Sequence, residues 1–218
     1  MIHKLEADGI QLKFGNRVIL SDIYLKCETG KITGLLGSNG QGKSCLMKAI
    51  YGPLKCEKSI RIDNVPQYEA FKRPDLLMFL PQFNFIPKGL SLKRVFDDFD
   101  LDYSLFEKRF TGSTTGYKSN IRNLSGGEHR LVELYIIVKS ITRFVILDEP
   151  FTHLSPIQAE EVTKLLLEEK DNKGILITDH LSKYITDICD NLYLLADGKI
   201  HLTKEIGEIE VLGYAKFR

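Results

Sequence analysis

A stretch of eight residues carries the most specific chemistry in the sequence. Residues 37–44 read Gly-Ser-Asn-Gly-Gln-Gly-Lys-Ser, which fits the phosphate-loop pattern of a glycine, four residues and Gly-Lys-Ser. The glycines let the backbone wrap closely around an anion, and the N–H groups of such a loop point positive dipoles at a phosphate. Lys43 adds a full charge for the β and γ phosphates, and the Ser44 hydroxyl is suited to ligate Mg²⁺.

The flanking residues must place this loop between a strand and a helix. Residues 31–36 predict a short buried strand, and residues 44–50 predict a helix with Leu46, Ala49 and Ile50 on one face. The alternative is a glycine-rich turn with a chance lysine. A strand before the loop and a helix after it favour phosphate binding.

An acidic pair ends another apolar run, at residues 144–147. In phosphate-loop proteins an aspartate at the position of Asp148 holds Mg²⁺ from the side opposite Ser44. The adjacent Glu149 is then suited to polarise a water molecule in line with the γ phosphate, as a general base. The alternative is an acidic exit from a strand into a surface loop, and the phosphate loop favours the functional interpretation.

A second anion site is predicted at residues 124–128, Leu-Ser-Gly-Gly-Glu. Ser125 and Glu128 have the spacing of a helix capping box, which is a sufficient structural explanation for both. That box does not require Gly126 and Gly127, however, and two glycines expose the helix N-terminus and its N–H groups. Since the phosphate loop already binds the one triphosphate of a monomer, the second site suggests a nucleotide presented by another copy.

The bulk composition bounds the class of protein. The chain has 218 residues, 43% of them hydrophobic, and a net charge of +1, which gives no strong electrostatic footprint for nucleic acid. Four cysteines without a Cys-x-x-Cys pair indicate reduced thiols in a cytosolic protein. No signal-peptide pattern is seen at the N-terminus, and no run approaches the roughly 20 apolar residues that span a bilayer. Work at a membrane therefore requires a partner.

Strands alternate with helices after the phosphate loop, which predicts a largely parallel α/β sheet. Alternating patterns joined at Gly15-Asn16 predict an N-terminal hairpin. Strands are expected at residues 5–14, 17–26, 59–63, 76–80, 144–147, 174–178, 191–196 and 199–202, and helices at 127–140, from Ser155-Pro156 onward and around 181–188.

The segment between residues 83 and 123 has a different character. Half of the twelve phenylalanines lie between residues 83 and 110, interleaved with acidic residues, and short helices fit this pattern better than strands. We expect at least half of these rings to form a small core. The others are expected to form an apolar groove, with an acidic rim from Asp97, Asp98 and Asp100, that suits an amphipathic helix of a membrane protein.

These motifs and their order resemble the nucleotide-binding subunit of an ABC transporter over nearly the whole length. Residues 37–44 are similar to Walker A, 144–148 to Walker B and 124–128 to the signature motif, with Glu128 where glutamine is commoner. The resemblance implies a P-loop NTPase of ABC type. It comprises one α/β domain over 1–218, with a mainly parallel core and an N-terminal antiparallel β-subdomain in 1–82 and 124–218, and a helical subdomain in 83–123.

The resemblance also implies the roles of individual residues, with ATP and Mg²⁺ as cofactors. Glu149, His180 at the switch histidine and Lys43 are the expected catalytic residues, and Mg²⁺ is expected at Ser44, Gln82 and Asp148. The ring of Phe14 is expected to stack on adenine, although an exposed strand phenylalanine could equally pack against the protein. Nucleotide contacts are expected from Phe14, Gly37, Ser38, Asn39, Gly40, Gln41, Gly42, Lys43, Ser44, Cys45 and Gln82, and in trans from Ser125, Gly126, Gly127 and Glu128.

One motif departs from the family pattern. The usual Ser-Ala-Leu-Asp of the dimerisation loop is Thr-His-Leu-Ser at residues 152–155, so Ser155 keeps the helix cap and loses the charge. Residues 125–133, 148–151 and 177–180 resemble the lipopolysaccharide-export and branched-chain amino-acid-uptake ATPases.

The function expected from this resemblance is ATP hydrolysis at a homodimer interface, driving substrate movement through separate integral-membrane subunits. The protein is then cytoplasmic and peripheral at the inner face of the cell membrane, with no nucleic-acid partner. Two alternatives stay open: an ABC-type ATPase in a role outside transport, and a nucleotide-dependent binding module with negligible turnover.

Overall fold

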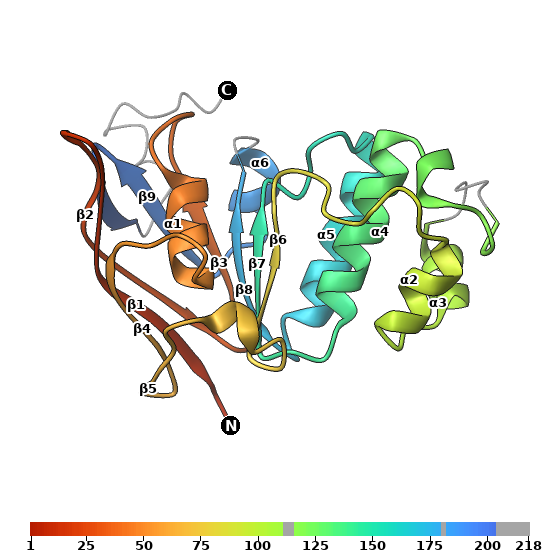
Figure 1. Ribbon diagram of the computed structural model, residues 1–218, viewed down its shortest axis with the longest axis horizontal. Helices are drawn as coiled ribbons and strands as arrows, with labels where there is room; N and C mark the ends of the chain where they lie inside the picture. Colours follow the sequence, from red (N-terminus) through yellow and green to blue (C-terminus); the bar gives the residue numbers. More distant parts are fainter. Residues whose placement is uncertain (111–115, 180–181, 204–218) are drawn as a thin grey trace.

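The protein is described by a computed structural model covering residues 1–110, 116–179 and 182–203, without the side chains of Ser182 and Lys183. Two sheets lie side by side with a helix between them, and further helices cover the outer face of the larger sheet (Figure 1). Within the described residues, no helix combines the length and the apolar character that crossing a membrane requires.

The larger sheet has six strands in the order β10-β9-β3-β8-β7-β6. Its strands are parallel except β10, which pairs antiparallel with β9. Every residue of β3, β7 and β8 is buried, as continuous apolar runs require in a sheet covered on both faces. The strands are β3 (Ile32–Leu36), β6 (Leu77–Leu80), β7 (Phe144–Asp148), β8 (Gly174–Thr178), β9 (Asn191–Ala196) and β10 (Lys199–Thr203).

The smaller sheet is antiparallel, with the order β2-β1-β4-β5. The predicted hairpin is confirmed, because Phe14 pairs with Arg17 on either side of Gly15-Asn16. The strands are β1 (Lys4–Phe14), β2 (Arg17–Glu28), β4 (Glu57–Ile62) and β5 (Val65–Pro66).

The helices form two layers around the larger sheet. Helix α1 (Lys43–Tyr51) lies between the two sheets, and α4 (Gly126–Lys139) and α5 (Pro156–Glu169) cover the other face (Figure 1). The predicted capping box of Ser125 and Glu128 is present at α4, and Ser155, the predicted cap of α5, forms a second capping box with Gln158. The remaining helices are α2 (Leu92–Asp98), α3 (Tyr103–Arg109), α6 (Ser182–Thr186) and the 3₁₀ turns η1 (Ala70–Lys72) and η2 (Ile121–Asn123).

The aromatic segment forms the small core that the sequence predicts. Four of its rings are buried against α4, whereas the side chains of Phe83 and Phe85 are 76% and 38% exposed. The predicted acidic rim is partly neutralised, because Asp97 pairs with Lys93 and Asp98 with Arg94. The buried rings are Phe96, Tyr103, Phe106 and Phe110.

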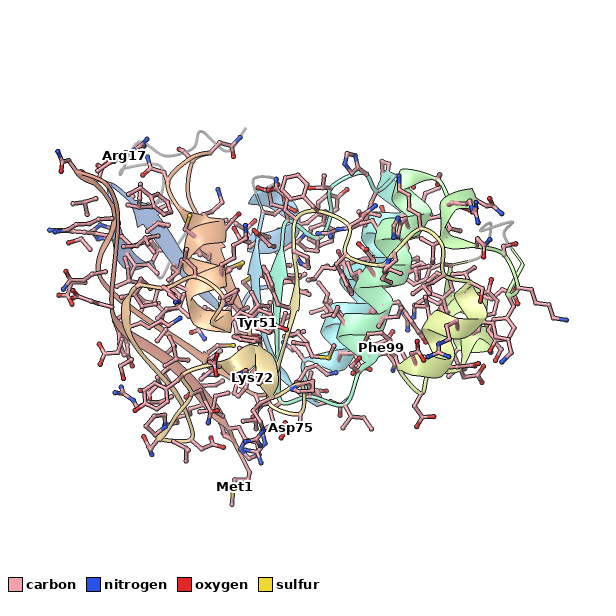
Figure 2. The ribbon with its side chains drawn as sticks, in the orientation of Figure 1. Met1, Arg17, Tyr51, Lys72, Asp75 and Phe99 are labelled. Atoms are coloured by element: carbon pink, nitrogen blue, oxygen red, sulfur yellow. The ribbon has the colours of Figure 1, made fainter. Side chains whose placement is uncertain are left out.

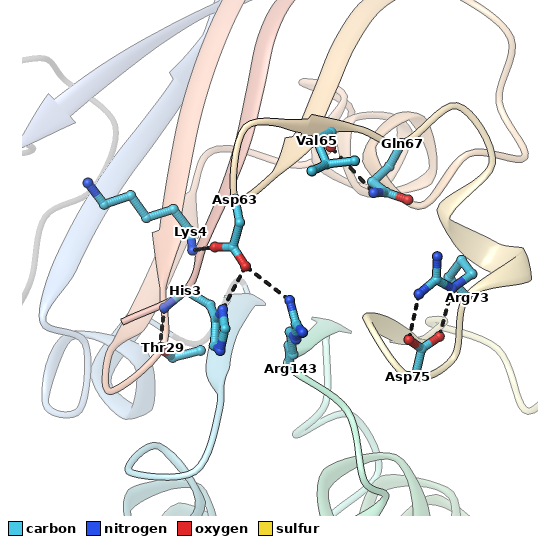
Figure 3. A network of polar contacts seen from close by, with 9 residues as sticks. All are labelled: His3, Lys4, Thr29, Asp63, Val65, Gln67, Arg73, Asp75 and Arg143. Carbon is cyan, nitrogen blue, oxygen red and sulfur yellow. Dashed lines mark hydrogen bonds and ion pairs between the residues drawn. The ribbon is translucent and has the colours of Figure 1, made fainter. Parts of the chain in front are cut away.

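A polar network ties the two sheets together at the end where the N-terminus lies (Figure 3). The carboxylate of Asp63, in the turn after β4, lies 2.6 Å from Nδ1 of His3 and accepts a 2.9 Å bond from the N–H of Lys4. Arg143, directly before β7 of the larger sheet, donates to the same carboxylate at 3.0 Å. Burial raises the pKa of Asp63, but these donors outweigh it and hold the pKa below its usual value.

Candidate functional site

The predicted site residues meet at one edge of the larger sheet. The parallel strands β3, β8, β7 and β6 end at the same edge, where the phosphate loop leads into α1 (Figure 1). Ligand-binding groups of open α/β sheets gather at the carboxyl ends of the strands. This topology explains why motifs far apart in the sequence come together.

The phosphate loop has the conformation that its glycines permit. Gly42 caps α1 with a φ of 104°, and Gly37 has a φ of 152°. A Cβ atom at Gly37 would lie 2.6 Å from the carbonyl oxygen of Leu195 on β9, so only glycine fits there. The loop therefore runs close to the neighbouring strand β9.

The side chain of Lys43 is buried and lies back over the loop. Its ammonium group donates to the carbonyl oxygens of Gly37 at 2.6 Å and Ser38 at 3.3 Å. Burial lowers the pKa of Lys43, while the charges of Glu149 and Asp148 oppose that shift. A phosphate in the loop would supply the opposite charge that this buried ammonium group favours.

Ser44 and Asp148 face each other across the site, as the sequence predicts. The Ser44 hydroxyl donates to Oδ1 of Asp148 at 3.1 Å. Asp148 is fully buried, and its Oδ2 has no hydrogen-bond partner among the described residues. Burial raises the pKa of Asp148, and the Ser44 bond partly offsets it.

This donor set fits Mg²⁺ bound together with a triphosphate. Mg²⁺ keeps several waters and takes one or two protein oxygens plus substrate phosphates, rather than a complete protein cage. A buried, unsatisfied carboxylate oxygen beside a hydroxyl meets that requirement. The described residues contain no group of three or more His, Cys, Asp or Glu that could hold a metal ion.

Gln82 and Glu149 are also brought together. Nε2 of Gln82, beyond the end of β6, donates to Oε2 of Glu149 at 2.8 Å. Glu149 is buried and has a φ of 50°, in the left-handed region that non-glycine residues seldom occupy. Its N–H group donates to the carbonyl oxygen of Thr178 at 2.9 Å, which holds it at the end of β8.

A cleft of about 390 Å³ joins these groups to the antiparallel sheet. Phe14, which is 54% exposed, lies at the wall of this cleft. The cleft is lined by Phe14, Arg17, Ile19, Asn39, Gly40, Gly42, Lys43, Ser44, Cys45, Gln82 and Glu149.

Two cleft residues, Arg17 and Ile19, were not predicted. Arg17 lies at the start of β2, at the edge of the molecule where the phosphate loop also lies (Figure 2). The signal was available in the hairpin, because the strand partner of Phe14 across Gly15-Asn16 is Arg17. Gln41 contacts another part of the fold, since its Oε1 accepts from the N–H of Asp197 at 3.1 Å.

Residues 125–128 line no part of this cleft as far as the structure describes the chain. Gly126 has open space where a Cβ would be, whereas a Cβ at Gly127 would lie 2.8 Å from the carbonyl oxygen of His153. Packing within the chain therefore explains why position 127 is a glycine, but it does not explain the glycine at position 126. The predicted switch residue His180 lies outside the described residues.

Comparisons with known proteins identify the family. A sequence profile described as ABC transporter matches residues 20–152. The chain is 28% identical over 217 residues to the lipopolysaccharide export system ATP-binding protein LptB of Haemophilus influenzae, covering 91% of this chain and 89% of that protein. It is 31% identical over 214 residues to a probable ABC transporter ATP-binding protein of Azorhizobium caulinodans, covering 90% and 75%.

Solved structures show the same fold. An ATP-binding subunit of an ABC transporter superposes with a TM-score of 0.76 at 20% identity, covering 96% of this chain and 93% of that one. A bacterial Atm1-family ABC exporter with ATP bound gives a TM-score of 0.82 at 15% identity, covering 95% of this chain and 40% of that one. The predicted ABC-type P-loop fold is confirmed. The chain belongs to the ABC transporter family.

Proposed function

We propose that this chain binds ATP and Mg²⁺ in the cleft and hydrolyses ATP as the ATP-binding subunit of a transporter with separate membrane subunits. The observation that carries the proposal is the pairing of Ser44 with Asp148 and of Gln82 with Glu149 beside the phosphate loop. Ser44 lies at the end of the phosphate loop, Gln82 lies after β6, and Asp148 and Glu149 lie at the end of β7, so three distant parts of the sequence supply these residues. A purely structural role does not explain a buried carboxylate oxygen with no partner among the described residues.

Each part of the cleft has a role in this mechanism. Phe14 stacks on adenine, the N–H groups of residues 37–44 bind the phosphates, and Lys43 neutralises charge on the β and γ phosphates. Mg²⁺, held by Ser44 and Asp148, would supply further neutralisation of the triphosphate. Glu149 accepts a proton from a water molecule while the oxygen of that water bonds to the γ phosphorus. The bond between the γ phosphorus and the β–γ bridging oxygen breaks, which leaves ADP and phosphate.

The catalytic unit is proposed to contain two copies of the chain. Each ATP then lies between the cleft of one copy and residues 125–128 of the other, whose helix N-terminus faces outward with an unobstructed Gly126. ATP binding favours the closed dimer and hydrolysis releases it, which is a ligand-driven population shift. His180 is proposed to contact the γ phosphate, and the helical subdomain is proposed to comprise residues 83–123 within one domain.

The test is Glu149→Gln, with Glu160→Gln as a control at an exposed carboxylate on α5. We expect Glu149→Gln to keep ATP affinity and to lose about 10²–10⁴-fold in turnover, because the amide cannot accept the proton. The variant should accumulate as a dimer with ATP in sizing chromatography and light scattering. Unchanged phosphate release by this variant would refute the catalytic assignment.

Transport coupling needs a separate measurement. The two alternatives are a non-transport ABC ATPase and a binding module with negligible turnover. Copurification with integral-membrane subunits distinguishes transport from the first alternative. Phosphate release by the wild-type protein, with and without those subunits, distinguishes an enzyme from the second.

A further inference from the structure

Arg130 is a buried cation on the helix that begins at the signature motif. Its side chain is 1% exposed, and its guanidinium donates to the carbonyl oxygens of Pro81 at 2.6 Å, Asp148 at 2.8 Å and Glu149 at 2.9 Å. These carbonyls lie at the ends of two neighbouring strands, β6 and β7. A single side chain thus joins the backbone before Gln82 to the backbone of the acidic pair.

The planar guanidinium suits this position. The N–H groups of a guanidinium point in fixed directions from two separate terminal nitrogens, so one side chain can donate to three carbonyls. A lysine ammonium has a single nitrogen and cannot match that geometry. The nearby carboxylate of Glu133, one helical turn along α4, lies 3.9 Å away. Glu133 in turn accepts from the N–H groups of Phe85 at 2.6 Å and Ile86 at 2.9 Å, so α4 holds the chain on both sides of Gln82.

The backbone of Glu149 needs such support. Its φ of 50° is unfavourable for a residue with a side chain, and such conformations persist only where the surroundings determine them. The carbonyl oxygen of Glu149 accepts from Arg130 at 2.9 Å and from the N–H of Thr152 at 3.4 Å. The Arg130 bond is the shorter of the two and comes from a different element.

We propose that Arg130 is a positioning residue for ATP hydrolysis, which fixes Glu149 and Gln82 relative to each other from the signature helix. The inference rests on the proposed ATPase function. The guanidinium of Arg130 bonds to the backbone carbonyls of Pro81, Asp148 and Glu149, so it acts on the Glu149 carboxylate through the backbone that carries it and not through the nucleotide. Its loss should lower kcat and leave ATP affinity unchanged.

The experiment compares Arg130→Met with Lys173→Met. Lys173 is a matched control, because this buried ammonium group donates to the carbonyl oxygens of Val138 at 2.5 Å and Ser140 at 2.8 Å, at the far end of α4. Both variants should melt at lower temperature. Only Arg130→Met should lose kcat, by about 100-fold, the loss that a small misplacement of a catalytic group causes.

Hydrogen–deuterium exchange supplies a measurement that does not depend on turnover. Arg130→Met should exchange faster at residues 148–152 and 82–86, and Lys173→Met should not. Arg130→Lys keeps the buried charge and replaces Arg130→Met in these experiments if the latter does not fold. It should be more stable than Arg130→Met and should have a kcat between those of Arg130→Met and the wild type. Wild-type kcat in a folded Arg130 variant, or unchanged exchange at residues 148–152, would overturn the proposal. A wild-type protein without ATPase activity would instead contradict the proposed function. The exchange result would still test whether Arg130 holds the backbone at residues 81 and 148–149.

Discussion

Gln82 and Glu149 form a 2.8 Å hydrogen bond although they are 67 residues apart in the sequence. The bond uses Nε2 of Gln82 as the donor, so it orients one carboxylate oxygen of the proposed base. Gln82 therefore links the start of the proposed helical subdomain to Glu149, the residue that is proposed to activate water.

Replacing Gln82 with methionine should remove this orientation and retain the shape of the side chain. We expect unchanged ATP affinity and a kcat reduced by about 10–100-fold, because the carboxylate of Glu149 loses the Gln82 hydrogen bond that helps to orient it. Steady-state phosphate release and calorimetry measure the two quantities. Gln67→Met is the matched control, since the side-chain amide of Gln67 donates to the carbonyl oxygen of Val65 at an exposed position after β5. Equal kcat values for the two variants would argue against the role of Gln82.

The two glycines of the signature motif should respond differently to alanine. Gly126→Ala should fold with the wild-type melting temperature, because a Cβ there meets open space. Gly127→Ala should lower the melting temperature, because its Cβ would lie 2.8 Å from the carbonyl oxygen of His153. Gly126 does not line the described cleft of its own copy. A loss of ATP-dependent dimerisation in Gly126→Ala would therefore indicate that Gly126 contacts the nucleotide bound by the second copy. Normal dimerisation and turnover of Gly126→Ala would place the shared nucleotide site elsewhere.

The sequence predicts the site best where the chemistry is local. A phosphate loop is contiguous, so the positions of Lys43 and Ser44 follow from spacing alone, and a carboxylate after an apolar strand identifies Asp148. Arg130 was not predicted, because a charged residue within an amphipathic helix pattern normally faces solvent. Its burial depends on carbonyls from two other strands, which only the tertiary structure places near it.

Several fold elements were predicted for equally local reasons. Gly15-Asn16 predicted the hairpin, and Ser155-Pro156 predicted the start of α5. The network around Asp63 was not predicted, since its partners His3 and Arg143 are distant in the chain. The acidic rim was only partly right, because the sequence pattern alone did not reveal that Asp97 and Asp98 already have basic partners one helical turn earlier.

The exposed rings that follow Gln82 are expected to contact a membrane subunit. Phe83→Ala and Phe85→Ala should keep ATP binding and reduce association with that subunit, because neither ring belongs to the buried core. Pull-down from membranes that contain the transporter measures association. Phe71→Ala is a control for Phe85→Ala, since both rings are 38% exposed and Phe71 lies on η1 in another part of the fold. Full association of the double variant Phe83→Ala/Phe85→Ala would move the contact to another surface.

An ion-pair cluster at the end of β2 should contribute stability that depends on pH. Hydrogen bonds from Lys26 and Lys31 lower the pKa of Glu28 from 4.5 to about 2. A lowered pKa in the folded state stabilises the protein above pH 4.5, and the contribution is lost as the pH falls toward 2. Because Lys31 is 45% exposed, solvent screens the pair, and Glu28→Gln should cost about 1 kcal/mol at neutral pH.

Urea unfolding at several pH values measures this contribution. The difference between wild type and Glu28→Gln should shrink as the pH falls below 4.5. Glu57→Gln, at an exposed position of β4 in the same sheet, should show no comparable difference. A difference that stays constant with pH would mean that Glu28 acts through packing and not through its charge.

At Glu149 the backbone conformation favours one residue for thermal stability, whereas the proposed enzymatic activity requires another. A glycine adopts a φ of 50° without the steric cost that a glutamate bears, on the order of 1 kcal/mol. Selection for stability alone would therefore favour glycine at this position and eliminate the proposed base. The protein keeps the less stable residue, which is the expected outcome where function and stability compete for the same backbone.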